Sequence, residues 1–171
     1  MAGEKFIQHD GAGGIKEVVS VQTGGSGKEN LIPSLDNTGR WSTTMMPVGI
    51  GADTVSMVTS EDLAAGDLVN IYDATAVPTA RKANATDATK PVVGFVLAAT
   101  TSPAAALIYM EGPITGLSAL TAGTRMYLSA ASSGALTPTP PTGTGMIVQF
   151  VGRAVNATTV NFEPDNPLLL A

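Results

Sequence analysis

The residues best suited to chemistry are few and far apart in the sequence. His9 is the only histidine, and it lies in a polar segment without a base, nucleophile or orienting partner nearby. Glu111 and Glu163 fall at equivalent points of two similar segments, and a carboxylate pair is what glycoside hydrolysis requires. Each glutamate, however, precedes turn-forming residues, Gly112-Pro113 or Pro164, so a polar strand end is the simpler interpretation. We therefore expect no catalytic residues and no enzymatic activity.

The sequence also argues against a phosphate, metal or cofactor site. The segment Gly24-Gly25-Ser26-Gly27-Lys28 resembles a phosphate-binding loop, but Glu29 stands where Ser or Thr is required and no helix pattern follows. The acidic residues are isolated, and the adjacent Glu61 and Asp62 are typical of a turn or cap. There is no cysteine for a disulfide or a thiolate ligand. We expect no cofactor and no bound metal.

The composition narrows the possible partners. The net charge is −5 and the nine Lys and Arg residues are scattered, which argues against nucleic-acid binding. Only 13% of the residues are charged, against about a quarter in typical soluble domains. Such a surface suits a protein covered by copies of itself or by a partner. The sequence has no apolar run of membrane-spanning or signal-peptide length, so we expect synthesis in the cytoplasm and no membrane partner.

Short apolar or alternating runs, separated by Gly, Pro, Asn and Asp, predict an all-β protein. No stretch shows the period of an amphipathic helix. Each run has the length of a strand and is rich in β-branched and aromatic residues. Many short strands with such turns indicate a compact β-barrel or a β-sandwich-like body. The runs are residues 67–72, 92–97, 106–110, 126–128, 146–151 and 159–162.

An internal repeat divides the predicted body into two related β-units. The segment 63–72 resembles 120–129, with Gly66 and Gly123 in the same place. Farther on, 93–96 matches 151–154, and 107–112 matches 159–164. A glycine with positive φ in the shared turn would present the next strand to a core. We predict a body at 48–171, made of units at about 48–113 and 114–171.

Residues 1–47 differ from the rest of the chain. They contain two glycine-rich stretches and few apolar residues, too few to form a core of their own. Pro33 and Pro47 favour an extended path for the residues before them. We predict an extended N-terminal arm that becomes ordered on a partner or on neighbouring subunits.

Two parts of the sequence resemble head-decoration (capsid cement) and head-fibre proteins of bacteriophages. The first is residues 27–47, with Ile32-Pro33, Leu35-Asp36, Gly39-Arg40 and Met46-Pro47, although Glu29-Asn30-Leu31 interrupts the usual phrase. The second runs from Tyr127-Leu128-Ser129 through 148–154 to 158–162. The resemblance covers most of the chain from Gly27 onward, and its motifs are structural.

The resemblance implies a non-enzymatic virion protein on the capsid surface. It also implies a homotrimer whose partners are further copies of itself and the major capsid protein. The function implied by the resemblance is that of a decoration or cement protein, which stabilises the joints between capsomers. The arm would then place apolar side chains against a neighbouring subunit or the capsid. The interface candidates are Ile32, Leu35, Trp41, Met45 and Met46.

Two alternatives remain open at the level of sequence. The motif at residues 27–47 would also fit a head or tail fibre, or a baseplate component that contacts the host receptor. Only eight residues are aromatic, which favours decoration over a receptor-binding tip. A polysaccharide hydrolase would need Glu111 and Glu163 in one cleft. Trp41 could also pack against the chain's own β body instead of a partner.

Overall fold

The computed structural model describes residues 5–46 except 30 and 38, and residues 53–171. The chain divides into two compact units, Met1–Gly51 and Ala52–Ala171. Almost all regular structure in the described residues is β, and one 3-10 turn, η1 (Thr43–Met45), is the exception. The prediction of an all-β protein is confirmed.

The N-terminal unit contains a hairpin that the sequence analysis did not predict. Strands β1 (Lys5–His9) and β2 (Ile15–Val19) pair in antiparallel register. Asp10 shapes the connecting turn, because its carboxylate accepts hydrogen bonds from the backbone N–H groups of Ala12 (2.8 Å) and Gly14 (2.9 Å). The rest of the unit is mostly turns and extended segments, so it has more local structure than a fully extended arm.

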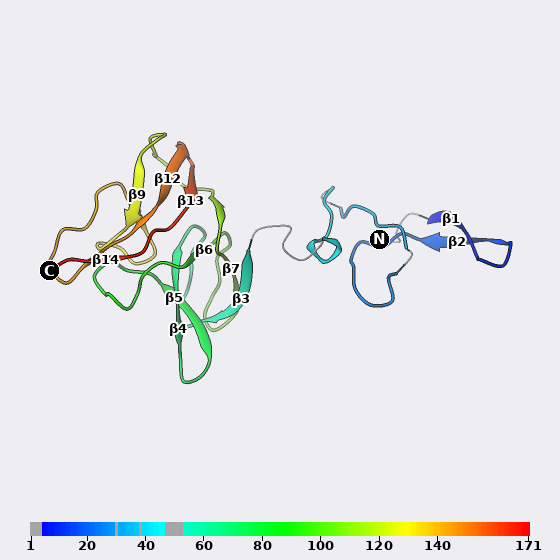
Figure 1. Cartoon of the computed structure of the whole chain (residues 1–171), viewed down its shortest axis with the longest axis horizontal. Helices are drawn as coiled ribbons and strands as arrows, with labels where there is room; N and C mark the ends of the chain where they lie inside the picture. Colours follow the sequence, from blue (N-terminus) through cyan, green and yellow to red (C-terminus); the bar gives the residue numbers. More distant parts are fainter. Residues whose placement is uncertain (1–4, 30, 38, 47–52) are drawn as a thin grey trace. The chain divides into compact units, whose positions relative to one another are not determined.

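The body, Ala52–Ala171, consists of two sets of strands and a short C-terminal pair (Figure 1). The first set forms a closed barrel in the order β3-β5-β4-β6-β7. Its strands are β3 (Thr54–Thr59), β4 (Leu68–Asp73), β5 (Pro78–Lys82), β6 (Gly94–Val96) and β7 (Ala105–Tyr109). The second set is an open sheet in the order β10-β9-β12-β13-β8. Its strands are β8 (Gly112–Ile114), β9 (Arg125–Leu128), β10 (Leu136–Thr137), β12 (Phe150–Asn156) and β13 (Thr159–Phe162). The remaining strands, β11 (Ile147–Val148) and β14 (Leu168–Leu169), pair with each other.

The two sets of strands pair in the same order, except that β3 and β5 pair and their counterparts β8 and β10 do not. In order, β3, β4, β5, β6 and β7 correspond to β8, β9, β10, β12 and β13. The shared turn has positive φ at Gly66 and Gly123, as the repeat predicted. The N–H of Gly66 donates to the carbonyl of Val96 and that of Gly123 to the carbonyl of Ala154, both at 2.8 Å. The body therefore consists of two related β-units, and the second begins with β8 at Gly112.

A second pair of glycines marks equivalent close approaches between strands. A Cβ on Gly94 would lie 2.7 Å from the carbonyl oxygen of Tyr109 on β7. A Cβ on Gly152 would fall on the carbonyl oxygen of Asn161 at the same place on β13. The matching Val-Gly dipeptides of the repeat are thus explained by strand spacing, because any side chain there would force the strands apart.

A shared apolar core joins the two units. One buried cluster combines side chains of the first unit, such as Leu68 and Phe95, with Ile114, Leu128 and Phe162 of the second. Phe95 is at its centre: its ring stacks on Tyr109 and tilts against Phe162, with centroids 5.5 and 5.1 Å away. A smaller cluster fills the first barrel. The body therefore has a core made entirely of its own residues.

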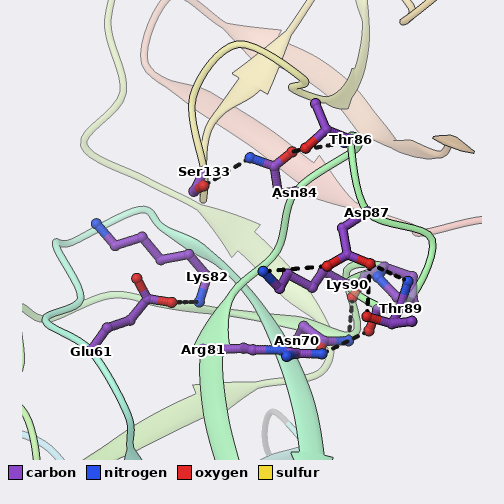
Figure 2. Close-up of polar contacts among 11 residues, drawn as sticks. Glu61, Asn70, Arg81, Lys82, Asn84, Thr86, Asp87, Thr89, Lys90 and Ser133 are labelled. Atoms are coloured by element: carbon purple, nitrogen blue, oxygen red, sulfur yellow. Dashed lines mark hydrogen bonds and ion pairs between the residues drawn. The ribbon is translucent and has the colours of Figure 1, made fainter. Parts of the chain in front are cut away.

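Polar contacts also join the units and fix the long loop after β5 (Figure 2). Asn84 donates to the Ser133 hydroxyl at 2.8 Å and accepts from the N–H and hydroxyl of Thr86. Asp87 repeats this arrangement with Thr89, and the Thr89 hydroxyl is the main reason why the pKa of Asp87 is lowered. The ionised Asp87 is the form that these hydrogen bonds favour. Its contribution to stability is therefore present above the ordinary aspartate pKa and is lost as the pH falls through the lowered value.

Candidate interaction surface

The acidic residues that the sequence analysis singled out accept hydrogen bonds within the chain. The Glu111 carboxylate accepts from the N–H of Asp53 at 3.3 Å, and that of Glu163 accepts from the Asn161 amide at 2.6 Å. Glu61 and Asp62 accept backbone N–H groups of Lys82 and Ser102, at 2.9 and 2.8 Å. The contact of Glu61 is drawn in Figure 2. Each of these four carboxylates thus accepts a hydrogen bond from another part of the chain.

The glycine-rich segment after β2 also forms local structure. The N–H of Gly24 donates to the Thr44 hydroxyl at 2.8 Å, and the N–H of Lys28 donates to the carbonyl of Gly25. The N–H of Gly27 donates to the Glu29 carboxylate, and backbone hydrogen bonds of Glu29 and Gly27 lower the pKa of Glu29. The N–H groups of Gly24, Gly27 and Lys28 are thus used within the chain. Among the described residues, no three His, Cys, Asp or Glu side chains are grouped as metal ligands. No helix among these residues has the length and hydropathy needed to cross a membrane.

The most distinctive surface belongs to the N-terminal unit. Between Lys5 and Met46, no side chain that the structure describes is buried. Fourteen large apolar side chains are exposed in the described parts of the chain, and seven of them lie in this unit. The unit makes up less than a third of the length of the chain. The seven side chains are Ile7, Ile15, Val19, Ile32, Leu35, Trp41 and Met46. A unit of this size with uncovered apolar groups lacks the burial that normally stabilises a fold.

Four of the five predicted interface residues are exposed, and the fifth, Met45, is partly buried. Trp41 is 50% exposed. It lines a shallow hollow of about 330 Å³ together with Met45, Leu31 and Pro33. Ile32, Leu35 and Met46 do not line this hollow, so Trp41 and Met45 are the two candidates that share it. That these residues contact a partner stays a prediction.

The hairpin adds exposed apolar side chains that were not predicted. Register places Ile7, Ile15 and Val19 on the same side, and all three are exposed. Lys5 and Glu17 form an ion pair on this side. The sequence signal was available: two runs of strand length with Phe, Ile and Val flank the turn formers Asp10-Gly11 and Gly13-Gly14, a pattern typical of a hairpin. It was masked by the low overall apolar content of residues 1–47.

Comparison of the chain with models of protein families, with curated proteins and with solved structures found no match.

Proposed function

We propose that this chain is a structural, non-enzymatic protein of a bacteriophage particle that binds the outer capsid surface and stabilises the joints between capsomers. The observation that carries the proposal is the N-terminal unit, whose described side chains are all at least partly exposed and include seven large exposed apolar groups. The body supplies its own core, so it does not need this unit for its stability. The unit is thus suited to contacts with other molecules, and the resemblance to decoration proteins supplies the kind of partner.

Self-association is part of the same proposal. The low charge of the chain reduces repulsion between copies, and the resemblance favours a homotrimer. An oligomer would bind the capsid through several equivalent contacts at once, so release would require all of them to break together. The major capsid protein is the second partner. Weak individual contacts are then sufficient for durable attachment.

Replacing Trp41 tests the capsid contact directly. A half-exposed tryptophan in an interface typically contributes about 2 kcal/mol or more, which is about a thirtyfold change in affinity. We expect Trp41→Ala to weaken binding to empty shells of the phage that encodes the chain by about that factor. Binding is measured as the fraction of protein that cosediments with shells across a concentration series.

The matched control is Val155→Ala, which truncates an exposed apolar side chain on β12 of the body. Its affinity for shells should equal that of the unchanged chain. Leu35→Ala is a second variant in the N-terminal unit and should also weaken binding. If Trp41→Ala and Leu35→Ala both bind shells as well as Val155→Ala, the N-terminal unit is not the capsid-binding part.

A further inference from the structure

Two arginines, here called the arginine pair, lie opposite each other on the second β-unit. Arg125 of β9 and Arg153 of β12 are partners in antiparallel register, and both are exposed. Two positive charges directly opposite one another on neighbouring strands destabilise a sheet. In the described chain, no carboxylate lies within ion-pair distance of either arginine. Glu163, which follows β13, accepts from the Asn161 amide instead. The arginine pair is thus an uncompensated positive patch.

The guanidinium groups of the arginine pair have N–H donors to spare. The Arg125 group lies over the Phe150 ring, with 4.7 Å between Cζ and the ring centroid, and 5.9 Å from the centroid of Tyr127. Stacking on an aromatic ring uses the flat face of a guanidinium and leaves the N–H groups on its edge for a carboxylate. The Arg153 group makes one long hydrogen bond, 3.5 Å, to the carbonyl of Gly123. Both groups are therefore suited to binding a carboxylate.

The equivalent position in the first unit is already an interface. By the internal repeat, Arg125 occupies the place of Leu68. Arg153 occupies that of Phe95, which is the register partner of Leu68. Leu68 and Phe95 are completely buried in the apolar cluster that joins the two units. The second unit repeats this face with exposed, charged side chains. A partner for the repeated face therefore has to supply negative charge.

The first unit of the chain carries charge of the matching sign. Residues 53–111 contain seven carboxylates and three basic side chains, a net charge of −4, whereas residues 112–171 have two of each and are neutral. The three bases are engaged within the unit. Lys82 and Lys90 pair with acids at 3.1 and 3.4 Å, and Arg81 donates to Asn70 and to the carbonyl of Thr89. Five carboxylates of the first unit are left without an ion pair among the described residues.

Among these five, Asp53 and Glu111 form the doublet that matches two arginines. They lie at adjacent strand ends, before β3 and after β7, and both are exposed. The N–H of Asp53 donates to the Glu111 carboxylate at 3.3 Å, which keeps the two residues together. The other three are a neighbouring pair that accepts backbone N–H groups of two different segments and a single aspartate at the end of β4, namely Glu61, Asp62 and Asp73.

We propose that the arginine pair of one copy binds the carboxylates of Asp53 and Glu111 of a second copy. Hydrogen bonds between arginine and carboxylate are among the strongest that side chains make, and the contact would offset the repulsion within the arginine pair. Every copy has one basic and one acidic face, so the contact is head-to-tail and closes into a ring when the rotation allows. From the proposed function, this inference takes only the association of copies.

Charge reversal in the full chain tests this contact without shells. Solution mass is measured by light scattering coupled to size exclusion over a range of concentrations, and far-UV circular dichroism checks the fold of each variant. Arg153→Glu and Glu111→Arg should each raise the concentration needed for association by about tenfold or more, because each brings like charges together across the contact. The matched control is Lys16→Glu, which changes the net charge of the chain as Arg153→Glu does, at an exposed position of β2. It should keep the mass of the unchanged chain.

A full exchange of charge identifies the partner residues. A chain with both arginines of the pair changed to Glu, and with Asp53→Arg and Glu111→Arg, should regain the mass of the unchanged chain, because opposite charges then meet again. A folded chain of this kind that stays monomeric would overturn the proposal. So would an unchanged chain that is a monomer at every concentration, or an Arg153→Glu variant that associates like the control.

Shell binding is measured separately, so loss of the capsid role would leave this result intact. An Arg153→Glu variant that keeps its solution mass but no longer binds shells would assign the arginine pair to the capsid protein and overturn the contact between copies.

Discussion

Phe95→Ala should destabilise the body by about 3–5 kcal/mol, which is the usual cost of removing a fully buried aromatic side chain. Phe95 is completely buried, and it contacts Tyr109 of the first unit and Phe162 of the second. Its removal would leave a cavity at the junction of the two β-units. Because both units line that cavity, neither can collapse into it without moving the other. We therefore expect a single unfolding transition at lower denaturant concentration for the whole body.

The measurement is urea unfolding of the full chain, followed by far-UV circular dichroism. Leu107→Ala serves as the control, because it truncates an exposed apolar residue on β7 and should change the free energy of unfolding by less than about 0.5 kcal/mol. If Phe95→Ala unfolds at the same urea concentration as the control, the two units do not share a core at this residue. Separate transitions in the unchanged chain would contradict the shared core as well.

Gln149→Ala should have the second-largest effect, about 2–5 kcal/mol, because it leaves buried backbone groups without partners. The Gln149 side chain is buried between the units. Its carbonyl accepts from the N–H of Val92 at 2.7 Å, and its amide donates to the carbonyls of Val92 (2.9 Å) and Asp165 (3.0 Å). One side chain thus joins the loop before β6 to the C-terminal segment. Truncation would remove all three hydrogen bonds together.

A further variant, Gln149→Met, separates the effect of lost hydrogen bonds from that of lost side-chain volume. Gln149→Met keeps most of the side-chain volume but cannot donate to either carbonyl, so it should lose nearly as much stability as Gln149→Ala. The matched surface control is Gln22→Ala. In the unchanged chain, the Gln22 side-chain amide donates one exposed hydrogen bond to the carbonyl of Leu35 at 3.0 Å. The unfolding midpoint of Gln22→Ala should be unchanged. A Gln149→Met variant as stable as the original chain would show that the side chain acts by packing alone.

The sequence predicted the strands whose side chains are the most apolar. Residues 68–73, 94–96 and 105–109 form strands close to the predicted runs, because apolar, β-branched and aromatic residues are concentrated there between turn formers. The two copies of the Gly66 turn were also visible, since positive φ requires glycine at this bend. The repeat indicated that the two units are related, but the order in which their strands pair was visible only in the structure.

Other elements gave no clear local signal. Strand β5 reads Pro-Thr-Ala-Arg-Lys, and its pairing with β3 and β4 compensates for a weak strand propensity. Whether β8 and β10 would close a second barrel depends on the lengths of strands that are far apart in the sequence. Pairing of this kind is a tertiary property, so a sequence pattern does not reveal it.

The candidate surface was predicted only in part. Trp41 and its neighbours were chosen because residues 1–47 have too few apolar side chains to bury a tryptophan, and the structure leaves Trp41 half-exposed. The exposed face at Ile7 and Ile15 was missed, because a hairpin was not expected there. That β8 and β10 do not pair could not be found from the sequence either, since no local pattern marks a strand pairing that does not form.

The most direct test of the account is to delete residues 1–47 and measure binding to empty shells of the encoding phage. The remaining chain contains the complete core, so it should unfold cooperatively at the same urea concentration as the body of the full chain. We predict that the full chain occupies the shells to saturation and that the truncated chain does not cosediment with them. Equal occupancy by the folded truncated chain would contradict the central claim that the N-terminal unit attaches this protein to the capsid.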